Sequence, residues 1–233
     1  MSTTLNRRTG TVKYQSLYCS QFRINGKERT MTAAATDHKE RLLSALERIL
    51  STKSYRDVTL SDITAGAKVS RRSFYENFSN KDDCLLALAR ITSQRIMESI
   101  LHAHSPGDSW VDTVSKVTRG YLEFIGSHPT LMYALYVEVA ALGQEGLLLR
   151  RDIGQLFARF LSLQTQLRRK NEEIQHELSE HAALALVAGI NELILQVFVE
   201  SDSGSLSEEL NKQLPEIGEV AQSLILRMTG SAE

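Results

Sequence analysis

The sequence lacks the residue patterns that identify most enzymes and metalloproteins. Its 233 residues include two cysteines, Cys19 and Cys84, which offer neither a metal-ligand spacing nor a disulfide framework. There is no GxSxG nucleophile motif, no phosphate-cradling glycine loop and no dinucleotide-binding fingerprint. We therefore expect neither an enzyme nor a cofactor, and the cysteine usage favours a reducing, cytoplasmic setting.

A metal site is also not expected. The run HELSEH, which begins at His176, fails the zinc-protease pattern because Glu180 stands where the second histidine is required. His176 and His181 are five residues apart, so their side chains would diverge on a helix.

No unbroken apolar run predicts a membrane span. The chain does not open with a signal-peptide pattern, and Asn191, Glu192 and Gln196 interrupt the most apolar stretch, residues 182 to 199. We interpret this stretch as a buried helix.

The net charge of −1 conceals an uneven distribution along the chain. Residues 1 to 90 hold 16 Lys and Arg against 9 Asp and Glu, whereas the remainder holds 11 against 19. A basic front half and an acidic back half indicate that only the front approaches a polyanion.

Residues 1 to 36 lack apolar periodicity and are interpreted as a disordered tail. Two alternatives stay open: translation beginning at Met31, so that residues 1 to 30 are not native, or a basic arm that adds contacts to DNA. From Asp37, with Glu40 as capping partner, apolar residues recur at helical spacing to about Thr52.

Residues 59 to 85 predict two short helices joined by a tight turn. Thr59 and Asp62 are typical of a capping box, so a helix is expected to begin at Leu60. Gly66 and Lys68 occupy the expected turn, after which Ser70 can cap the second helix. The expected inward residues are Leu60, Ile63, Ala67, Val69, Phe74 and Phe78, and the expected solvated ones are Ser61, Asp62 and Thr64.

The second short helix is expected to present a basic, hydroxyl-rich face, the layout of a helix-turn-helix that reads DNA. Its exposed residues are expected to be Arg71, Arg72, Ser73, Tyr75 and Asn77. Arginine can bond a guanine edge in two places, and hydroxyls and amides suit phosphates and bases. Asn80 and Asp83 are expected to cap the next helix, with Lys81 at its N-terminal end near a DNA phosphate.

Residues 37 to 90 resemble the TetR family of bacterial transcriptional regulators. The resemblance rests on the run Val-Ser-x-x-x-aromatic-Tyr-x-x-Phe-x-x-Lys, which begins at Val69 and ends at Lys81. Two positions depart from the family pattern: Lys68 stands where glycine is usual, and Thr64 where alanine is usual. A non-glycine residue in a left-handed turn costs about 1 kcal/mol, so the turn is tolerable.

Eight residues are expected to contact DNA. Arg71, Arg72 and Ser73 are predicted to contact bases, and Thr59, Tyr75, Asn77 and Lys81 to contact phosphates. Ser70, the expected cap, completes the predicted interface.

The rest of the chain also shows helical periodicity, without strand-like alternation, so the predicted class is all-α. After a helix from Lys81 to about Ala103, the break Ser105-Pro106-Gly107 precedes helices expected over residues 109–126, 129–141, 146–170, 177–200 and 207–228, the last interrupted at Pro215. The predicted parts are the tail, a three-helix DNA-binding domain over 37–85 and a helical ligand-binding and dimerisation domain over 86–233.

The apolar stretch from Ala182 to Phe198 needs cover on every side, which a partner chain or the monomer could supply. In the TetR family the last two helices commonly form a four-helix bundle across a two-fold axis, and here Leu224, Ile225 and Met228 could supply the matching surface. Dimerisation would place two recognition helices ~34 Å apart on a palindrome.

Aromatic residues with a few polar neighbours are typical of a small-molecule pocket, although aromatics at helical spacing belong more often to an ordinary core. The candidate pocket residues are Trp110, Tyr121, Phe124, Tyr133 and Tyr136. Regulators of the family that this chain resembles usually bind an inducer there.

Together these features predict a homodimeric, ligand-responsive DNA-binding regulator, a repressor that a small molecule releases from a palindromic operator. The alternative is a DNA-bound platform for protein partners with the same fold and no small-molecule inducer.

Overall fold

The computed structural model describes residues 33–105, 107–201 and 204–230, and every regular element in these ranges is a helix. The predicted all-α class is therefore confirmed. The elements are α2 (Ala33–Ile49), the 3₁₀ turn η1 (Tyr55–Asp57), α3 (Leu60–Ala67), α4 (Arg71–Asn77), α5 (Lys81–Ala103), α6 (Trp110–Ser127), α7 (Pro129–Tyr133), the π-helical η2 (Ala134–Glu138), α8 (Val139–Ala141), α9 (Gln144–Lys170), α10 (Glu180–Glu200) and α11 (Leu206–Thr229).

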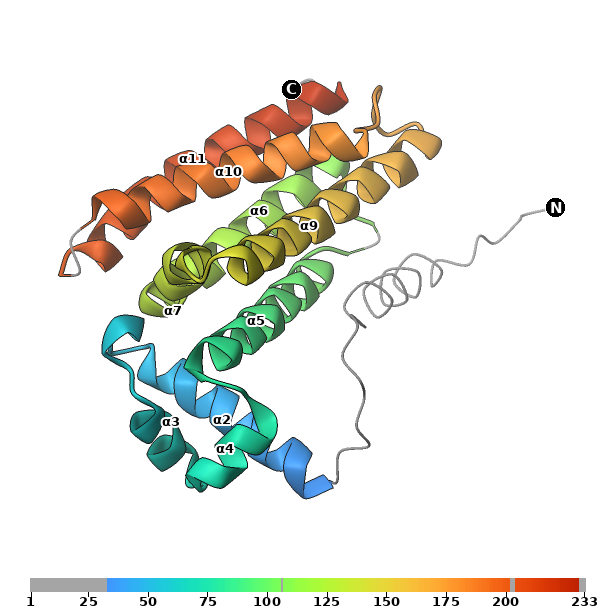
Figure 1. Cartoon of the computed structure of the whole chain (residues 1–233). Coiled ribbons are helices and arrows are strands. Elements are labelled where there is room, and N and C mark those ends of the chain that lie inside the picture. The colour runs from blue at the N-terminus through green and yellow to red at the C-terminus, as the bar shows by residue number, and fades with distance from the viewer. Residues whose placement is uncertain (1–32, 106, 202–203, 231–233) are drawn as a thin grey trace.

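Helices α2 to α4 form a compact head at one end of the molecule, and α10 and α11 run side by side at the opposite end (Figure 1). Helix α5 leaves the head and packs against α6 and α9. Because α5 passes Leu85 without a break, the predicted boundary between residues 85 and 86 stays a prediction.

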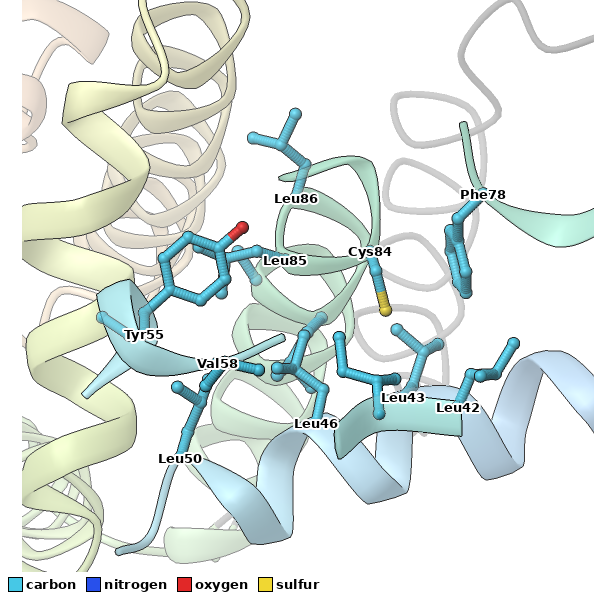
Figure 2. Close-up of a cluster of buried hydrophobic side chains, with 14 of the residues drawn as sticks. Leu42, Leu43, Leu46, Leu50, Tyr55, Val58, Phe78, Cys84, Leu85 and Leu86 are labelled. Atoms are coloured by element: carbon cyan, nitrogen blue, oxygen red, sulfur yellow. The ribbon is translucent and has the colours of Figure 1, made fainter. Parts of the chain in front are cut away.

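Leucines of α2 fill the core of the head. Leu42 and Leu46 of α2, and Leu50 directly after its end, are fully buried, and Cys84 of α5 points its sulfur toward α2 beside Phe78 (Figure 2). Burial raises the pKa of the Cys84 thiol to about 12. A protonated, inaccessible thiol is a packing residue.

The apolar core of the head continues into the second part of the chain. Leu131, Ala134, Val139 and Leu149, from α7 to α9, belong to the same buried cluster as the leucines of α2. A movement of these helices therefore acts directly on residues that pack against the head.

Helices α6, α9, α10 and α11 form a bundle with two further clusters of buried residues. One is centred on Ile125, Ile194 and Leu210, and the other on Trp110 and Ala183. The bundle supplies the walls for the cavities described below.

Several predicted helix ends differ from the observed ones. Asp37 is not a helix cap, because α2 already begins at Ala33. Of the predicted tail over residues 1–36, residues 33–36 belong to α2 and residues 1–32 lie outside the described residues. Helix α10 begins at Glu180 behind the cap Ser179, three residues later than expected. The predicted helix over 129–141 contains the π-helical η2, in which the amide of Val139 donates to the carbonyl of Ala134.

The predicted interruption at Pro215 is wrong, because α11 continues through it. Proline removes one helical hydrogen bond, which leaves the carbonyl of Asn211 without its usual donor. Both Pro215 and Asn211 are exposed, so water can serve that carbonyl and the helix persists.

Helix α9 ends with three basic residues, of which Arg169 and Lys170 are exposed and Arg168 is held by neighbouring residues. Arg168 is only 11% exposed at its side chain, donates to the carbonyl of Asp108 and to Thr113 Oγ1, pairs with Glu173 and lies over the ring of Trp110. It joins the end of α9 to the start of α6.

Helix α10 is long and apolar enough to cross a membrane by length and composition alone. Only 28% of its most apolar window is buried within the chain. Its residues Ala185, Ala188 and Gly189 are exposed, and Val199 is 67% exposed. A large share of its apolar surface therefore remains uncovered in a single chain.

Candidate nucleic-acid interface and inner cavity

The turn between α3 and α4 has the geometry that the sequence predicts. Thr59 accepts from the amide of Asp62 while the Asp62 carboxylate accepts from the amide of Thr59, so the capping box is confirmed. Lys53 also pairs with Asp62 at 2.8 Å, and these hydrogen bonds lower the pKa of the carboxyl to about 2. Lys68 ends α3 in the left-handed region, at φ 54°.

Two arginines of α2 hold this turn from behind. Arg41 Nη2 donates to the carbonyl of Lys68 at 2.8 Å, and Arg48 Nη2 donates to the carbonyl of Gly66 at 2.9 Å. Gly66 belongs to α3 rather than to the turn, and a Cβ there would lie 3.3 Å from the Cβ of Ala45. Close packing of α3 on α2 therefore fixes the angle at which α4 is presented.

Thr64, expected to be solvated, is buried. Its Oγ1 donates to the carbonyl of Leu60, so the hydroxyl is satisfied within α3. The expectation failed because helical spacing places residue 64 next to Ile63 and Ala67 at the edge of the inward face.

Helix α4 begins behind Ser70, whose side chain accepts from the amide of Ser73, as predicted. Phe74 and Phe78 are buried as expected. Arg71, Arg72 and Tyr75 are exposed on the outer face, with Tyr75 60% exposed.

The two arginines are positioned by bonds to neighbours. Arg71 Nη2 donates to Ser61 Oγ at 2.7 Å, and Arg72 Nε donates to Glu76 Oε1 at 3.0 Å. The side chain of Arg72 is nevertheless 89% exposed, so most of its guanidinium faces solvent. Such a group is oriented at one nitrogen and available at the others.

Two predicted phosphate contacts have partners inside the protein. Asn77 donates to the carbonyl of Ser73, and its Oδ1 is buried. Lys81 donates to the carbonyls of Tyr55 and Val58, at 3.3 and 3.0 Å, with its ammonium 4.5 Å from the centre of the Tyr55 ring. In this conformation Lys81 holds η1 against α5, and its contact with DNA stays a prediction.

The bundle encloses a polar cluster between α6, η2 and α10. The hydroxyls of Tyr121 and Tyr136 are 2.6 Å apart, and they lie 2.8 and 2.9 Å from Asn191 Oδ1. Burial raises the pKa of Tyr121 to about 12 and that of Tyr136 well above its usual value, so both phenols are neutral.

Two cavities adjoin this cluster, each of about 90 Å³. Tyr121, Phe157 and Asn191 line both, so these side chains form the wall between the two chambers. The first chamber also contains Tyr136, Ser93 and Arg150. The second is almost entirely apolar, with Ile100, Val117, Leu122, Phe160, Val187 and Ile190 among its lining residues.

Only two of the five candidate pocket residues, Tyr121 and Tyr136, line these chambers. Phe124 stacks on His128, and Tyr133 packs edge-on against Phe198 within the core. Trp110 lies at the far end of the bundle, where it donates to Thr229 Oγ1 and lines an open groove.

One ion pair joins the cavity region to the head. Arg56 of η1 donates to Glu138 Oε1 at 3.0 Å, and Glu138 belongs to the same π-helical segment as Tyr136. The Glu138 side chain is 7% exposed and that of Arg56 is 73% exposed. Sequence reasoning found neither this pair nor Asn191 and Arg150, because the residues lie far apart along the chain.

Comparison with known proteins identifies the head. A family model described as bacterial regulatory proteins, tetR family, matches residues 42–88. The chain is 29% identical over 118 residues to the transcriptional regulator EthR of Mycolicibacterium smegmatis, and 27% identical over 117 residues to EthR of Mycobacterium tuberculosis. The head of this chain therefore belongs to the tetR family of bacterial regulatory proteins.

These sequence matches cover 47% and 49% of this chain, and the chain spans about half the length of these curated relatives, 51% and 54%. The family match lies in the head and the first turns of α5. Within this TetR-family head, Lys68 and Thr64 are the departures from the family pattern, and arginines of α2 and a buried hydroxyl accommodate them.

Solved structures share the fold across most of the chain. Salmonella enterica GusR matches with a TM-score of 0.62 at 14% identity, covering 82% of this chain and 95% of that protein. Thermus thermophilus FadR, a TetR-family repressor in complex with lauroyl-CoA, matches with a TM-score of 0.59 at 16% identity, covering 84% and 96%. At these identities the likeness concerns the fold alone.

No group of three or more His, Cys, Asp or Glu side chains suited to a metal ion occurs among the residues described by the structure.

Proposed function

We propose that this TetR-family chain is a cytoplasmic transcriptional repressor that binds a palindromic operator and is released by a small molecule. The observation that carries the proposal is the outer face of α4. There Arg71 and Arg72 each form one hydrogen bond to a neighbouring side chain and remain exposed to solvent. Two adjacent oriented guanidiniums suit guanine edges in a major groove. The neighbouring residues Thr59, Ser70, Ser73, Tyr75, Asn77 and Lys81 complete the proposed interface.

The proposed assembly is a homodimer through α10 and α11. The uncovered apolar face of α10 lies beside α11, whose Val220, Leu224 and Met228 are 39, 43 and 41% exposed at a spacing of one helical turn. Ile225, which was expected on this face, is buried in the bundle and does not belong to it. A partner chain would cover both helices and set the distance between two heads.

The proposed effector site is the pair of chambers around Tyr121 and Tyr136. A concave, mostly apolar cavity with a few convergent polar groups is the usual form of a ligand site. FadR of Thermus thermophilus and of Bacillus subtilis, which share the fold, are bound to lauroyl-CoA and stearoyl-CoA in their structures. These complexes support a small-molecule effector for this chain.

The proposed coupling between the two sites has two routes. Helix α5 carries Ala89, Ser93 and Ile96 on the wall of the first chamber and begins inside the head at Lys81. Segment η2 carries Tyr136 at the chamber and the Glu138 carboxylate that binds Arg56 of the head. An effector can shift the orientation of the heads only as far as its affinity differs between the two states.

The first experiment is footprinting on the DNA flanking the gene, with excess nonspecific competitor, comparing the native chain, Arg72→Ala and Arg119→Ala. Arg119 is an exposed arginine of the bundle and serves as the matched control. We expect a protected palindrome that Arg72→Ala weakens by about 1–3 kcal/mol and Arg119→Ala leaves unchanged.

Equal weakening of specific and nonspecific DNA by Arg72→Ala would remove this residue from base recognition. No specific protection by the native chain at any salt concentration would favour the alternative of a protein-binding platform.

A further inference from the structure

The inner chambers contain an arginine whose charge has no carboxylate partner. Arg150 of α9 lines the first chamber and forms no ion pair within the described part of the chain. Its neighbour Arg151, by contrast, pairs with Asp152 at 2.7 Å. A guanidinium at a partly enclosed, mostly apolar site is best satisfied by a planar anion.

The positive charge of Arg150 also reaches the phenol cluster. Burial raises the pKa of Tyr136 well above its usual value, and the charge of Arg150 acts in the opposite direction. An anion placed between Arg150 and Tyr136 would therefore meet a cation and a phenolic hydroxyl together.

The cluster has too few hydrogens for its contacts. Three short oxygen–oxygen contacts join Tyr121, Tyr136 and Asn191 Oδ1, but the two phenols supply only two hydrogens, and an amide oxygen supplies none. At any moment one of the three contacts lacks a hydrogen bond. One phenol can therefore redirect its O–H toward a ligand oxygen while the other keeps Asn191.

The second chamber indicates the chemistry of the rest of the ligand. Its walls are mostly aliphatic and aromatic, and Tyr121 and Phe157, whose ring centres are 5.9 Å apart, line both chambers. Each chamber holds about 90 Å³, and even the two together are below the roughly 300–1,000 Å³ of most ligand sites, so the ligand must be small. A ligand that fills both must have one polar end and a slender apolar body.

We propose that the effector is an amphipathic carboxylate whose head group binds Arg150 and a phenol in the first chamber and whose apolar chain enters the second chamber past Phe157. This inference rests on the proposed function for its regulatory meaning. The binding chemistry itself stands on Arg150, the phenol cluster and the two chambers.

Calorimetric titration of the full-length protein with octanoate and with octan-1-ol tests the head group. The two probes share the apolar chain, so the difference between them reports the carboxylate. We expect saturable binding of one octanoate per chain, at least 10-fold tighter than octan-1-ol. Arg150→Gln should reduce that preference to less than 3-fold, whereas Arg151→Gln, which alters an arginine paired outside the chamber, should retain it.

A second variant tests where the alkyl chain of the ligand binds. Val117→Phe, in the wall of the second chamber, should weaken decanoate binding more than butanoate binding by at least 5-fold, because only the longer chain needs that space. Unfolding midpoints measured without ligand identify any variant that fails to fold, in which case Val117→Leu replaces Val117→Phe.

The proposal is overturned if octan-1-ol binds as tightly as octanoate, if Arg150→Gln and Arg151→Gln act alike, or if neither probe binds. Operator footprinting on the same protein samples separates these outcomes from a failure of the proposed function. If the protein binds its operator but not octanoate, only the proposed ligand class is rejected. If it binds octanoate but no specific DNA site, the proposed regulatory function is rejected.

Discussion

The head and the bundle of this protein are both built from α-helices, but their cores are packed differently. In the head, leucines of α2 meet Phe74, Phe78 and Cys84 in a closed apolar core. In the bundle, two phenols and an amide bond to one another beside two chambers. A closed core suits a rigid surface that must match DNA, whereas an incompletely filled core leaves space whose occupation can change the arrangement of helices.

The largest expected effect concerns the uncovered face of the bundle. Leu224→Asp should dissociate the proposed dimer and weaken operator binding by about 10²–10⁴-fold, because each head would then bind its half-site alone. Leu147→Asp is the matched control, since Leu147 is 58% exposed on α9 and lies outside this face. Sedimentation velocity with parallel operator titrations makes the measurement. A Leu224→Asp protein that stays dimeric would place the interface elsewhere.

The next effect compares the two cores by the same substitution. Leu46→Ala, fully buried in the head, should cost near the upper end of about 2–5 kcal/mol, and Leu122→Ala, beside the second chamber, near the lower end. Leu122 already faces empty space on one side and so loses fewer contacts. Urea unfolding of both variants measures the difference, and equal costs would contradict the contrast in filling.

A smaller effect is expected at the link between the two regions. Glu138→Gln keeps an oxygen that can accept from Arg56 but removes the charge, so stability should change little. The effect of octanoate on operator affinity should fall by about 0.5–2 kcal/mol. Glu180→Gln, which alters an ion pair within the bundle, is the control. Operator titrations with and without octanoate measure this effect. The same octanoate effect in both variants would exclude the ion pair as a route of coupling.

The smallest effect concerns one strained residue in each region. Lys68 in the head and Glu172 in the bundle have φ values of 54° and 61°. Replacing either by glycine should raise the free energy of unfolding by about 1 kcal/mol or less, since relief of strain is partly offset by the flexibility of unfolded glycine. Urea unfolding checks both. A loss of stability in Lys68→Gly alone would show that its side chain stabilises the turn.

Local chemistry in the head was predictable because it acts over three or four residues. The capping box at Thr59, the cap at Ser70 and the inward face of Phe74 and Phe78 follow from spacing along one helix. The same reasoning failed at Pro215, where exposure to water removed the cost on which the predicted break depended.

The residues of the proposed ligand site show the opposite case. Tyr121 and Tyr136 were candidates because they are aromatic, as were Trp110, Phe124 and Tyr133, and sequence offered no means of separating the two groups. Their distinction depends on Asn191, which is 70 residues from Tyr121 and 55 from Tyr136. Similarly, Lys81 matched the family motif, but its bonds to the carbonyls of Tyr55 and Val58 required the fold of η1.

The sequence by itself determined the all-helical class, the helix-turn-helix and its exposed arginines, because hydrophobic periodicity and capping are short-range properties of the chain. Only the tertiary structure decided which aromatics share a cavity, that Arg150 lines it without an ion pair to any described residue, and that Glu138 connects it to the head. Those contacts join residues far apart in sequence, and the free energy of each depends on burial and on partners that no local pattern specifies.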